Sequence, residues 1–524
     1  MDMSSVPEGF NVGVHLLDRH LQEGRGNKIA IYFQDETYTY AQLLELANQA
    51  GNALLDLGLE RENRVLICLP DSPWFMGIYF GAMRIGAVPV PVNTMASWRE
   101  YVYYLNDSRA KVLVTTSRIW DVISEHKDDL KFLGAKVLVD DQRPDCHHLS
   151  TLLEAASAKL TPVETSRNDM AFWLYSSGTT GTPKGVIHLH HDLPYFMSPL
   201  CEQVLNLSTE DVVFSTSKMF FSYGRNNSLD SVFLTGTSVV LSPERPSPEN
   251  ILPVLKKYRP TILYSVPSSY AAILRYMDQQ EIEPDLSFLR MCLSAGEALP
   301  LVVFEHWKKK FGLEIINGVG SSDVGAIYMS NQPGQVQPGS SGKILSGFEA
   351  RLLDDGSQEV PKGETGTLWI KNKGTTPGYW NKHTKTQQVI CHDWFCTGDR
   401  FFEDDQGNYH YAGREDDMLK PGGIWMSPLE VEDILLRHPA VDECGIVGFR
   451  DVNNLEKPLA FVVLSKSYAP SDDLAHELKE HVKSYTAHYK YPRWIKFVDE
   501  LPRTATGKLQ RYRLRLLIDY GGQI

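Results

Sequence analysis

The segment YSSGTTGTPKG (residues 175–185) decides how the rest of the chain is interpreted. It combines glycines with serine and threonine hydroxyls and ends in Pro-Lys-Gly, and the apolar run AFWL (171–174) before it predicts a buried strand leading into a loop. Glycine allows backbone N–H groups to point inward, and such groups bind anions together with hydroxyls and a lysine ammonium. The segment therefore predicts a phosphate-binding loop.

A loop of this composition has two other interpretations. A Walker loop is excluded, because that motif has adjacent glycine and lysine, whereas Thr182 and Pro183 separate Gly181 from Lys184 here. A flexible surface loop is the ordinary explanation of a run rich in glycine, serine and threonine. The Pro-Lys-Gly ending favours phosphate binding over that alternative.

The same string resembles the signature loop of the adenylate-forming enzymes, the superfamily of acyl-CoA ligases, peptide-synthetase adenylation domains and luciferases. Further segments match that superfamily in order, from near Tyr38 to Arg513. The resemblance implies that the loop binds ATP phosphates and that Lys184 is catalytic. The loop residues that it assigns to the nucleotide are Ser176, Ser177, Gly178, Thr179 and Thr180.

Composition limits the class of protein. A chain of 524 residues should divide into two or more domains, and 42% hydrophobic with 22% charged residues is typical of a soluble globular protein. The formal net charge of −13 argues against nucleic acid as a partner. Seven cysteines, an odd number scattered along the chain, indicate free thiols in a reducing compartment. The N-terminus has no apolar segment of the kind that a secretory signal contains. We therefore expect a cytoplasmic protein. His392 between Cys391 and Cys396 does not have the spacing of a common zinc motif.

One segment, residues 74–92, is apolar enough to suggest a membrane. It contains Arg84 and two prolines, Pro89 and Pro91, which a spanning helix would not favour. A buried helix followed by a strand explains the segment better, so no membrane partner is expected.

Helix and strand patterns alternate along the first four-fifths of the chain. Thr39 and Gln42 predict a capping box before a helix that Gly58 ends. Short apolar runs predict buried parallel strands, and an amphipathic segment at 250–258 predicts a helix between two of them. These runs begin at residues 64, 111, 136, 211, 237 and 261. The predicted fold class is α/β, with layered sheets.

The pattern changes towards the C-terminus. Residues 363–411 predict a small β layer of shorter strands, and GREDDMLKPGG (413–423) is a charged, glycine-rich connector. A helix from residue 428, strands at 443–448 and 459–464 and a helix from 473 follow. We expect a large N-terminal domain of residues 1–415, which binds ATP and the acyl group, and a small, mobile α+β domain of residues 416–524.

The resemblance implies further nucleotide contacts. Gly296 lies in a segment that matches the adenine wall, Asn317 matches the residue that pairs with the adenine amino group, and Ser322 matches a contact to the α-phosphate. Asn317 could instead cap a strand end. The complete set implied in these segments is Ser294, Ala295, Gly296, Glu297, Asn317, Gly318 and Ser322.

Asp323 matches the superfamily's Mg²⁺ ligand, although the superfamily usually has Thr-Glu where this chain has Ser322 and Asp323. A shorter carboxylate still suits an ion that keeps several waters. Asp399, in a Thr-Gly-Asp string, and Arg414 resemble the residues that bind ribose. A solvated turn is the alternative for Asp399.

Lys508 resembles the catalytic lysine of the small domain, where a cation stabilises the charge that develops on the phosphoryl oxygens. Asp416 matches the hinge about which that domain rotates between two half-reactions. The rotation would bring Lys420, Gly422 and Gly423 to a channel for the CoA thiol. ATP, Mg²⁺ and coenzyme A are the implied cofactors.

The acyl pocket is implied by segments that look most like benzoate–CoA ligases, a group that includes ligases for 2-aminobenzoate. Its residues would be Phe221, Ser222, Tyr223, Gly320, Ala326 and Ile327. Benzoate ligases usually have alanine at the position of Ser222 and a large imidazole side chain at the position of Ala326. We therefore expect a roomier and slightly more polar pocket in this chain. The expected activity is an AMP-forming aryl-CoA ligase for benzoate or 2-aminobenzoate.

Several alternatives remain open at this point. The acceptor could be a carrier-protein phosphopantetheine thiol, and a luciferase-type oxygenase or a catalytically inactive nucleotide-binding scaffold is also conceivable. His188, His190 and His191 could suggest a second metal, although Asp323 already provides a Mg²⁺ site. The small domain's basic residues could bind CoA phosphates or form solvated helix faces, and a homodimer is possible. Those basic residues are Lys483, Lys490, Arg493, Arg503, Arg511, Arg513 and Arg515.

Overall fold

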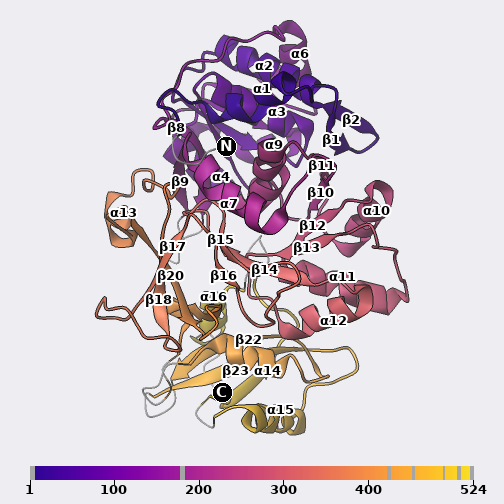
Figure 1. Cartoon of the computed structure of the whole chain (residues 1–524), viewed down its shortest axis with the longest axis vertical. Coiled ribbons are helices and arrows are strands. Elements are labelled where there is room, and N and C mark those ends of the chain that lie inside the picture. Colours follow the sequence, from indigo (N-terminus) through magenta and orange to yellow (C-terminus); the bar gives the residue numbers. More distant parts are fainter. Residues whose placement is uncertain are drawn as a thin grey trace.

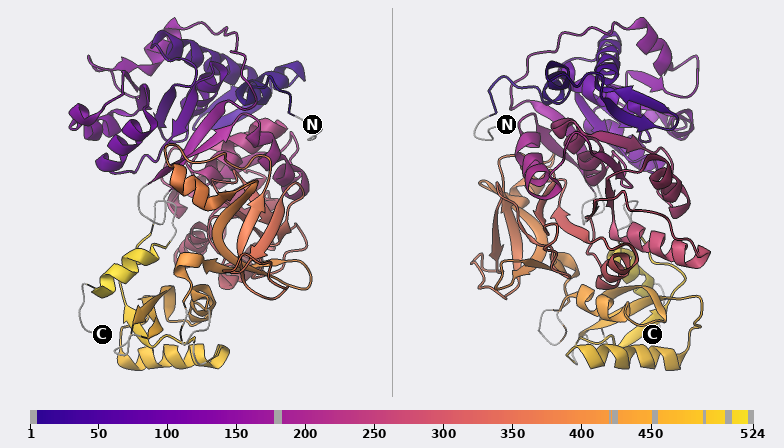
Figure 2. Two further views of the ribbon diagram at one scale, coloured as in Figure 1. Left: turned by 90° about the vertical axis from the view of Figure 1, so that its left-hand side faces the viewer. Right: turned by 45° about the vertical axis from the view of Figure 1, so that its right-hand side comes forward.

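The computed structural model describes residues 6–176, 183–419, 421, 426–450, 455–487, 490–503 and 509–519. The chain forms stacked α/β layers, with the N-terminal layers at the top of Figure 1 and a smaller C-terminal unit, coloured yellow, at the bottom. In Figures 1 and 2 the small orange β sheet lies between these two parts. The predicted α/β class is confirmed.

The first sheet has the strand order β4-β3-β5-β6-β7 and is parallel throughout. Helices separate these strands along the chain, and the sheet is buried. Its strands are therefore rich in branched apolar residues. The strands are β3 (Arg64–Cys68), β4 (Val88–Pro91), β5 (Val112–Thr115), β6 (Ala135–Leu138) and β7 (His147–His148). The helices are α1 (Val12–Gln22), α2 (Tyr40–Asp56), α3 (Pro73–Arg84), α4 (Trp98–Ser108), α5 (Ser117–Ser124), η1 (Lys127–Asp129) and α6 (Leu149–Ala155).

The second sheet is longer, with the order β16-β15-β14-β13-β12-β10-β11-β1-β2. Its centre is parallel, but its two edges are antiparallel, where connections are too short for a crossover. The strands are β1 (Ile29–Phe33), β2 (Glu36–Thr39), β10 (Val212–Ser215), β11 (Ser238–Leu241), β12 (Ile262–Ser265), β13 (Met291–Ser294), β14 (Ile315–Gly320), β15 (Ile327–Ser330) and β16 (Lys343–Ile344).

Helices connect the strands of this second sheet. Two short π-helical segments, η2 and η3, interrupt the helices that precede β10 and β11. The set is α7 (Asp192–Leu200), η2 (Cys201–Leu205), α8 (Ser222–Arg225), η3 (Asn226–Asp230), α9 (Ser231–Thr235), α10 (Pro248–Tyr258), α11 (Pro267–Gln280) and α12 (Leu301–Phe311).

The segment quoted at the outset joins two antiparallel strands, β8 (Met170–Ser176) and β9 (Lys184–Leu189). The predicted strand before the loop is confirmed, and β8 is buried over residues 171–174. The second strand was not anticipated, because its apolar residues do not alternate cleanly: His188 is fully buried among them. Lys184, the first residue of β9, pairs in register with Ser176.

The small β layer and the C-terminal unit also match their predictions. The layer contains β17 (Glu349–Leu353), β18 (Gly366–Lys371), α13 (His383–Val389), β19 (Ile390–Cys391), β20 (Trp394–Glu403) and β21 (Tyr409–Arg414), and η4 (Glu415–Asp417) follows. The C-terminal unit has a three-stranded sheet and three described helices. They are α14 (Pro428–Leu435), β22 (Val441–Arg450), β23 (Glu456–Leu464), α15 (Asp472–Tyr485), β24 (Trp494–Phe497) and α16 (Arg511–Asp519).

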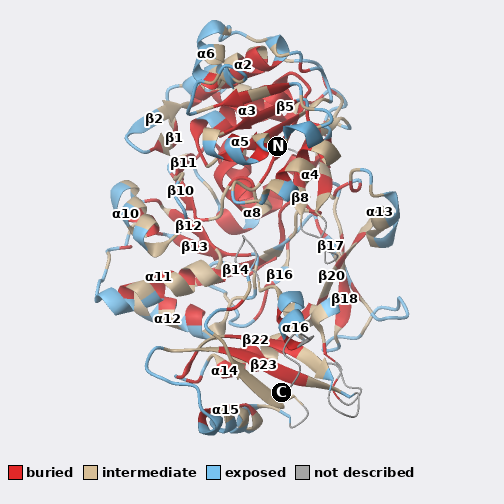
Figure 3. Cartoon of the chain, turned by 180° about the vertical axis from the view of Figure 1, so that it is seen from behind, coloured by how far each residue is buried: buried red, intermediate tan, exposed pale blue. Residues whose placement is uncertain are grey.

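Local predictions for the large domain are borne out. Thr39 caps α2 with the reciprocal bonds of a capping box, in which its hydroxyl accepts from Gln42 N–H. The apolar segment at 74–92 contains α3 and β4, which are buried almost throughout (Figure 3). Within the described residues, no helix has both the length and the apolar character that a membrane span requires.

Candidate active site

Three side chains from distant parts of the chain meet beside the end of the signature segment. Lys184 Nζ donates to Asp323 Oδ1 at 3.1 Å and to the Tyr379 hydroxyl at 2.6 Å, and that hydroxyl donates to Asp323 Oδ1 at 2.7 Å. The ammonium also lies 3.9 Å from the Tyr379 ring centroid. Burial lowers the pKa of Lys184, and the Asp323 carboxylate opposes that change. A cation and a carboxylate are thus held together in a mostly buried site.

The backbone positions each member of this cluster. Tyr379 lies against β9, where Trp380 N–H donates to the Gly185 carbonyl at 2.9 Å. On the other side, His188 Nε2 lies 2.7 Å from the Ser322 carbonyl oxygen, so this nitrogen carries a proton and holds the residue before Asp323. Asp323 O itself accepts from Thr376 N–H at 2.8 Å. β9 therefore organises both partners of Lys184.

Two buried polar atoms lie on adjacent strands of the second sheet. Ser294, at the end of β13, pairs in register with Asn317 of β14. The two residues are 0% and 8% exposed, and neither Ser294 Oγ nor Asn317 Oδ1 has a hydrogen-bond partner among the described residues. Leaving a buried acceptor unpaired is costly, so these atoms suit a polar ligand. Gly296 follows with a φ of +92°, which favours glycine.

A second charged pair lies in the small β layer. Asp399 of β20 and Arg414 of β21 are register partners, and Arg414 Nη1 donates to Asp399 Oδ1 at 3.1 Å and to the Thr397 carbonyl at 3.0 Å. Burial alone would lower the pKa of Arg414, but the charge and hydrogen bond of Asp399, together with Tyr411 and Asp416, outweigh burial and the pKa is raised. The arrangement holds a carboxylate beside the connector that leads to η4.

The two predicted acyl segments also lie side by side. Ser222 Oγ, at the start of α8, lies 3.5 Å from the Gly325 carbonyl oxygen, next to Ala326. Tyr223 donates its hydroxyl to the Leu293 carbonyl at 3.1 Å, beside Ser294. Gly320 pairs in register with Ile327, and a Cβ at residue 320 would lie 2.6 Å from the Ala326 carbonyl oxygen, so this approach requires glycine. Ala326 is buried, whereas Phe221, Ser222 and Tyr223 are partly exposed.

Comparison with known proteins identifies the family of this chain. The AMP-binding enzyme family model matches residues 17–380, and the model for the AMP-binding enzyme C-terminal domain matches residues 430–508. The chain belongs to the AMP-binding enzyme family.

Individual relatives show which branch of the AMP-binding family this chain resembles. The benzoate–CoA ligase of Thauera aromatica is 41% identical over 513 residues, which is 97% of this chain and 96% of that protein. A crystal structure of the anthranilate CoA ligase AuaEII in complex with anthranoyl-AMP has a TM-score of 0.94 and 38% identity, covering 99% of both chains. A benzoate CoA ligase from Burkholderia xenovorans LB400 has a TM-score of 0.88 and 37% identity, covering 97% of this chain and 100% of its own.

Some residues that the AMP-binding resemblance singled out lie outside the described residues. They are Ser177, Gly178, Thr179, Thr180, Lys420, Gly422, Gly423 and Lys508. Their proposed roles rest on the sequence.

The structure does describe the hinge candidate Asp416, which lies exposed in η4. Its carbonyl accepts from Arg515 Nη2 at 3.3 Å. Glu297 is half-buried, with Ser268 Oγ 3.4 Å from its carboxylate.

Sequence reasoning missed Tyr379 and His188. Tyr379 lies in the string TTPGYW (375–380), which carries no motif chemistry by itself and is far from Lys184 along the chain. The sequence suggests a metal ligand or an ordinary surface histidine at position 188, but His188 is fully buried and bonds to the Ser322 carbonyl oxygen. His190 is also buried and accepts from Val12 N–H. Among the described residues, no group of three histidine, cysteine or acidic side chains could hold a metal.

The basic residues of the small domain are largely paired within that domain. Lys490 contacts Glu430 at 2.6 Å, Arg503 contacts Glu443 at 2.8 Å, and Arg511 contacts Glu432 at 2.5 Å. Arg515 contacts Asp417 at 2.8 Å. These pairs favour a structural role in this arrangement of the domains, and the CoA-binding alternative stays a prediction.

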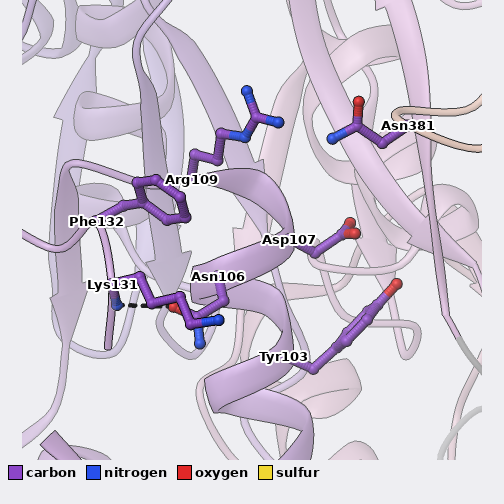
Figure 4. A pocket seen from close by; sticks show the side chains of 7 residues that line it. All are labelled: Tyr103, Asn106, Asp107, Arg109, Lys131, Phe132 and Asn381. Carbon is purple, nitrogen blue, oxygen red and sulfur yellow. Dashed lines mark hydrogen bonds between the residues drawn. The ribbon is translucent and has the colours of Figure 1, made fainter. Parts of the chain in front are cut away.

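Two surface cavities lie close to the charged cluster, one beside α4 and one beside α13. One, of about 440 Å³, is lined by Tyr103, Asn106, Asp107, Arg109, Lys131, Phe132 and Asn381 (Figure 4). Asp107 accepts there from the Tyr175 hydroxyl at 2.8 Å, which anchors the end of β8. The other, of about 480 Å³, includes Tyr379 and residues of α13. Tyr379 therefore links the charged cluster to the surface.

Proposed function

We propose that this chain is an ATP-dependent aryl-CoA ligase. It activates an aromatic carboxylate as acyl-AMP, releasing pyrophosphate, and then transfers the acyl group to coenzyme A, releasing AMP. The observation that carries the proposal is its 41% identity over nearly full length to a benzoate–CoA ligase, in a chain that assembles the charged cluster of Lys184, Asp323 and Tyr379.

The nucleotide is proposed to bind across the ends of β13 and β14. The unpaired Asn317 Oδ1 is an acceptor of the kind that the adenine amino group requires, and the bare backbone at Gly296 allows a flat base to approach. Asp399 accepts from the ribose hydroxyls, with Arg414 holding its carboxylate in place. The assigned contacts of Ser176, Ala295, Glu297, Gly318 and Ser322, and of the loop between β8 and β9, belong to this proposal.

The first half-reaction requires positive charge at the phosphates. The substrate carboxylate attacks the α-phosphorus, and negative charge builds on the phosphoryl oxygens and on the leaving pyrophosphate. Lys184 supplies one cation beside the loop, and Lys508 is assigned a second, which also aligns the acyl oxygen. No enzyme nucleophile is needed, because the adenylate itself is the activated acyl group.

Asp323 fits a Mg²⁺ ion. It offers a buried carboxylate, and Mg²⁺ is commonly held by one or two carboxylates together with substrate phosphates rather than by a full protein cage. When bound, the ion would screen the phosphate charges. In the described structure Lys184 and Tyr379 share Asp323 Oδ1, so they set the position of this carboxylate.

We propose that residues 416–524 rotate as a small domain about Asp416 between the half-reactions. Lys508 would leave the site, and Lys420, Gly422 and Gly423 would face the thiol. Hinge rotation needs only a few backbone dihedrals to change, and Asp416 lies exposed between β21 and the C-terminal unit, where such a change meets little packing.

The acid is assigned as benzoate or an ortho-substituted relative, with 2-aminobenzoate the leading candidate. The small side chain of Ala326 and the hydroxyl of Ser222 motivate this choice, and Phe221, Tyr223, Gly320 and Ile327 complete the pocket. The high structural similarity to a ligase crystallised with anthranoyl-AMP supports it. A pocket that hydrogen-bonds a substituent can discriminate more strongly than one that only encloses it.

All seven cysteines are free thiols, which supports a reducing, cytoplasmic setting for the enzyme. Light scattering at working concentration tests the homodimer that the sequence left open.

ATP–pyrophosphate exchange tests the proposed function. The acids are benzoate, its amino and hydroxy derivatives, and acetate as an aliphatic control. We expect exchange with aryl acids and, after addition of CoA, stoichiometric AMP and aroyl-CoA. Comparison with a phosphopantetheinylated carrier protein identifies the acceptor. Exchange with acetate alone, or no acid-dependent exchange, would overturn the assignment.

A further inference from the structure

A fully buried ion pair lies directly behind Ser222. Arg225, the last residue of α8, and Asp230, the last of η3, are both 0% exposed, and Arg225 Nη2 lies 2.9 Å from Asp230 Oδ2. The Arg225 guanidinium lies 3.9 Å from the Phe172 ring centroid and 5.9 Å from that of Phe196, so aromatic surface lies against its charge. Replacing a buried ion pair by apolar residues often leaves stability unchanged or raises it. Folding alone therefore gives little reason for these charges.

The pair fixes the orientation of the Asn226 amide. Asp230 Oδ2 accepts from Arg225 Nε at 2.9 Å and from Asn226 Nδ2 at 2.9 Å. Only the amide nitrogen can donate to a carboxyl oxygen, so Asn226 Oδ1 must face the opposite way. Burial raises the pKa of Asp230 and Arg225 opposes that change. The orientation holds in either protonation state, because Oδ2 accepts from two N–H groups, those of Arg225 Nε and Asn226 Nδ2.

Asn226 in turn fixes the direction of the Ser222 hydroxyl. Ser222 Oγ lies 3.4 Å from Asn226 Oδ1 and 3.5 Å from the Gly325 carbonyl oxygen. Both neighbours are acceptors, so the single Ser222 proton points toward them, over long hydrogen bonds. The lone pairs of Ser222 are then available on its exposed side, and the hydroxyl presents itself to the pocket as an acceptor.

Resting on the aryl-CoA ligase assignment above, we propose that Asn226, Arg225 and Asp230 are positioning residues that hold Ser222 as a hydrogen-bond acceptor. The enzyme then selects aromatic acids whose ring carries a hydrogen-bond donor, an amino or hydroxyl group, over acids with an apolar or acceptor-only group of similar size. Four side chains thus form one relay: Arg225 holds the Asp230 carboxyl group, Asp230 orients the Asn226 amide, and the amide orients the Ser222 hydroxyl.

Matched acid pairs test this relay. Amino and methyl groups are similar in size, as are hydroxyl and fluoro groups, but only one member of each pair donates. We measure kcat/KM for both pairs at ring positions 2, 3 and 4. In the parent enzyme we expect the donor to be preferred by about tenfold or more at the position that meets Ser222, since a site that hydrogen-bonds a substituent rejects the analogue without it.

Variants then separate the relay from general packing. Ser222→Ala should bring the donor/non-donor ratio close to one. Asn226→Leu, which keeps the side-chain size, should lower the ratio at least threefold, with the Gly325 carbonyl still orienting part of the Ser222 population. Ser231→Ala is the matched control: its hydroxyl donates to the Asn227 carbonyl in the same helical stretch and is not part of the relay. Its ratio should equal that of the parent.

The double variant Arg225→Leu with Asp230→Leu provides a second route to the same result, since it removes both charges and leaves neither unpaired. Its ratio should fall as in Asn226→Leu. Equal ratios in the parent, Ser222→Ala and Asn226→Leu, with aryl acids still supporting pyrophosphate exchange, would overturn the relay while the proposed function stands. Absence of exchange with every aryl acid would instead overturn the function itself.

Discussion

Tyr379 joins two groups that lie 139 residues apart in the chain, Lys184 and Asp323. Its hydroxyl accepts from the ammonium and donates to the carboxylate, so one oxygen sets the distance between both charges. Burial and the neighbouring Asp323 charge raise the pKa of Tyr379, which keeps the hydroxyl protonated and able to donate. A phenol is suited to this position because it is neutral and serves as donor and acceptor at once.

Tyr379→Phe removes that hydroxyl and keeps the ring. We expect ATP–pyrophosphate exchange to fall about tenfold, because one hydrogen bond to a charged group contributes roughly 1.5–3 kcal/mol and part of it is recovered by the remaining Lys184–Asp323 contact. The thermal midpoint should change little. Tyr258→Phe, which loses a surface bond to the Gln34 carbonyl, is the control. Parent-like exchange in Tyr379→Phe would mean that the cluster is structural only.

Lys508 is expected to act in one half-reaction only. Lys508→Ala should slow acyl-AMP formation by a hundred- to a thousandfold, roughly 3–4 kcal/mol of transition-state stabilisation. Thioester formation from supplied aroyl-AMP should be much less affected, because the lysine would have rotated away. Single-turnover measurements of each half-reaction provide the comparison, and equal losses in both would contradict the two-arrangement mechanism.

At the scale of elements, β9 supports more than the charged cluster. Directly after this strand, His190 Nδ1 accepts from Val12 N–H at 3.1 Å, which satisfies a free donor at the start of α1, while Asn11 Oδ1 accepts from Val14 N–H. The imidazole must be neutral to accept. Burial lowers the pKa of His190 to about 4; Asp169 opposes this, and Arg61 and His191 add to it.

The pKa of His190 makes stability depend on pH. Between the folded value of about 4 and the ordinary value of 6.5, the unfolded chain binds more protons, so the free energy of unfolding rises with pH across this window. The contribution is complete above pH 6.5 and is lost as pH falls toward 4. From pH 7.5 to 5.5 we expect a loss of about 1 kcal/mol for this residue, since each pKa unit corresponds to about 1.4 kcal/mol.

Calorimetry of the parent and of His190→Gln at pH 7.5 and 5.5 measures this effect. The glutamine keeps an acceptor but does not titrate, so the acid-induced drop in the thermal midpoint should be smaller in the variant. His15 and His20, whose pKa values burial also lowers to about 4, continue to titrate in both proteins, so some drop remains. Identical drops in the two proteins would show that α1 does not depend on a neutral His190.

At the scale of the whole molecule, an ion pair between described residues connects the large part of the chain to the C-terminal unit. Arg275 of α11 lies 3.0 Å from Asp442 of β22, and both side chains are partly exposed. Burial raises the pKa of Asp442, and Arg275 opposes that change. The pair stabilises the arrangement of Figures 1 and 2, in which β22 lies below α11.

Arg275→Ala removes this connection. Partly exposed pairs contribute up to about 1 kcal/mol, so we expect the ratio of pyrophosphate exchange to thioester formation to change by two- to fivefold. The charge-exchanged variant, Arg275→Asp with Asp442→Arg, should restore the parent ratio at low salt and lose it at high salt. A ratio that neither substitution alters would mean that this contact does not influence the domain arrangement.

The sequence alone determined the local chemistry and the class of fold. The strand before the signature loop, the capping box at Thr39 and the helix–strand interpretation of residues 74–92 are all confirmed. Each depends on residues close together in the chain, where hydrophobic period and turn chemistry act directly. The family and its ligase branch followed from the same local strings, and comparison bears them out.

Only the tertiary structure decided which distant side chains meet. Nothing near Tyr379 in the sequence indicates that its hydroxyl bridges Lys184 and Asp323, and nothing near Ser222 indicates that its hydroxyl lies beside the Gly325 carbonyl oxygen. Such contacts depend on strand register and on where a loop crosses β9. These are settled by the packing of the whole chain, because a shift of one residue in register would turn each side chain to the other face.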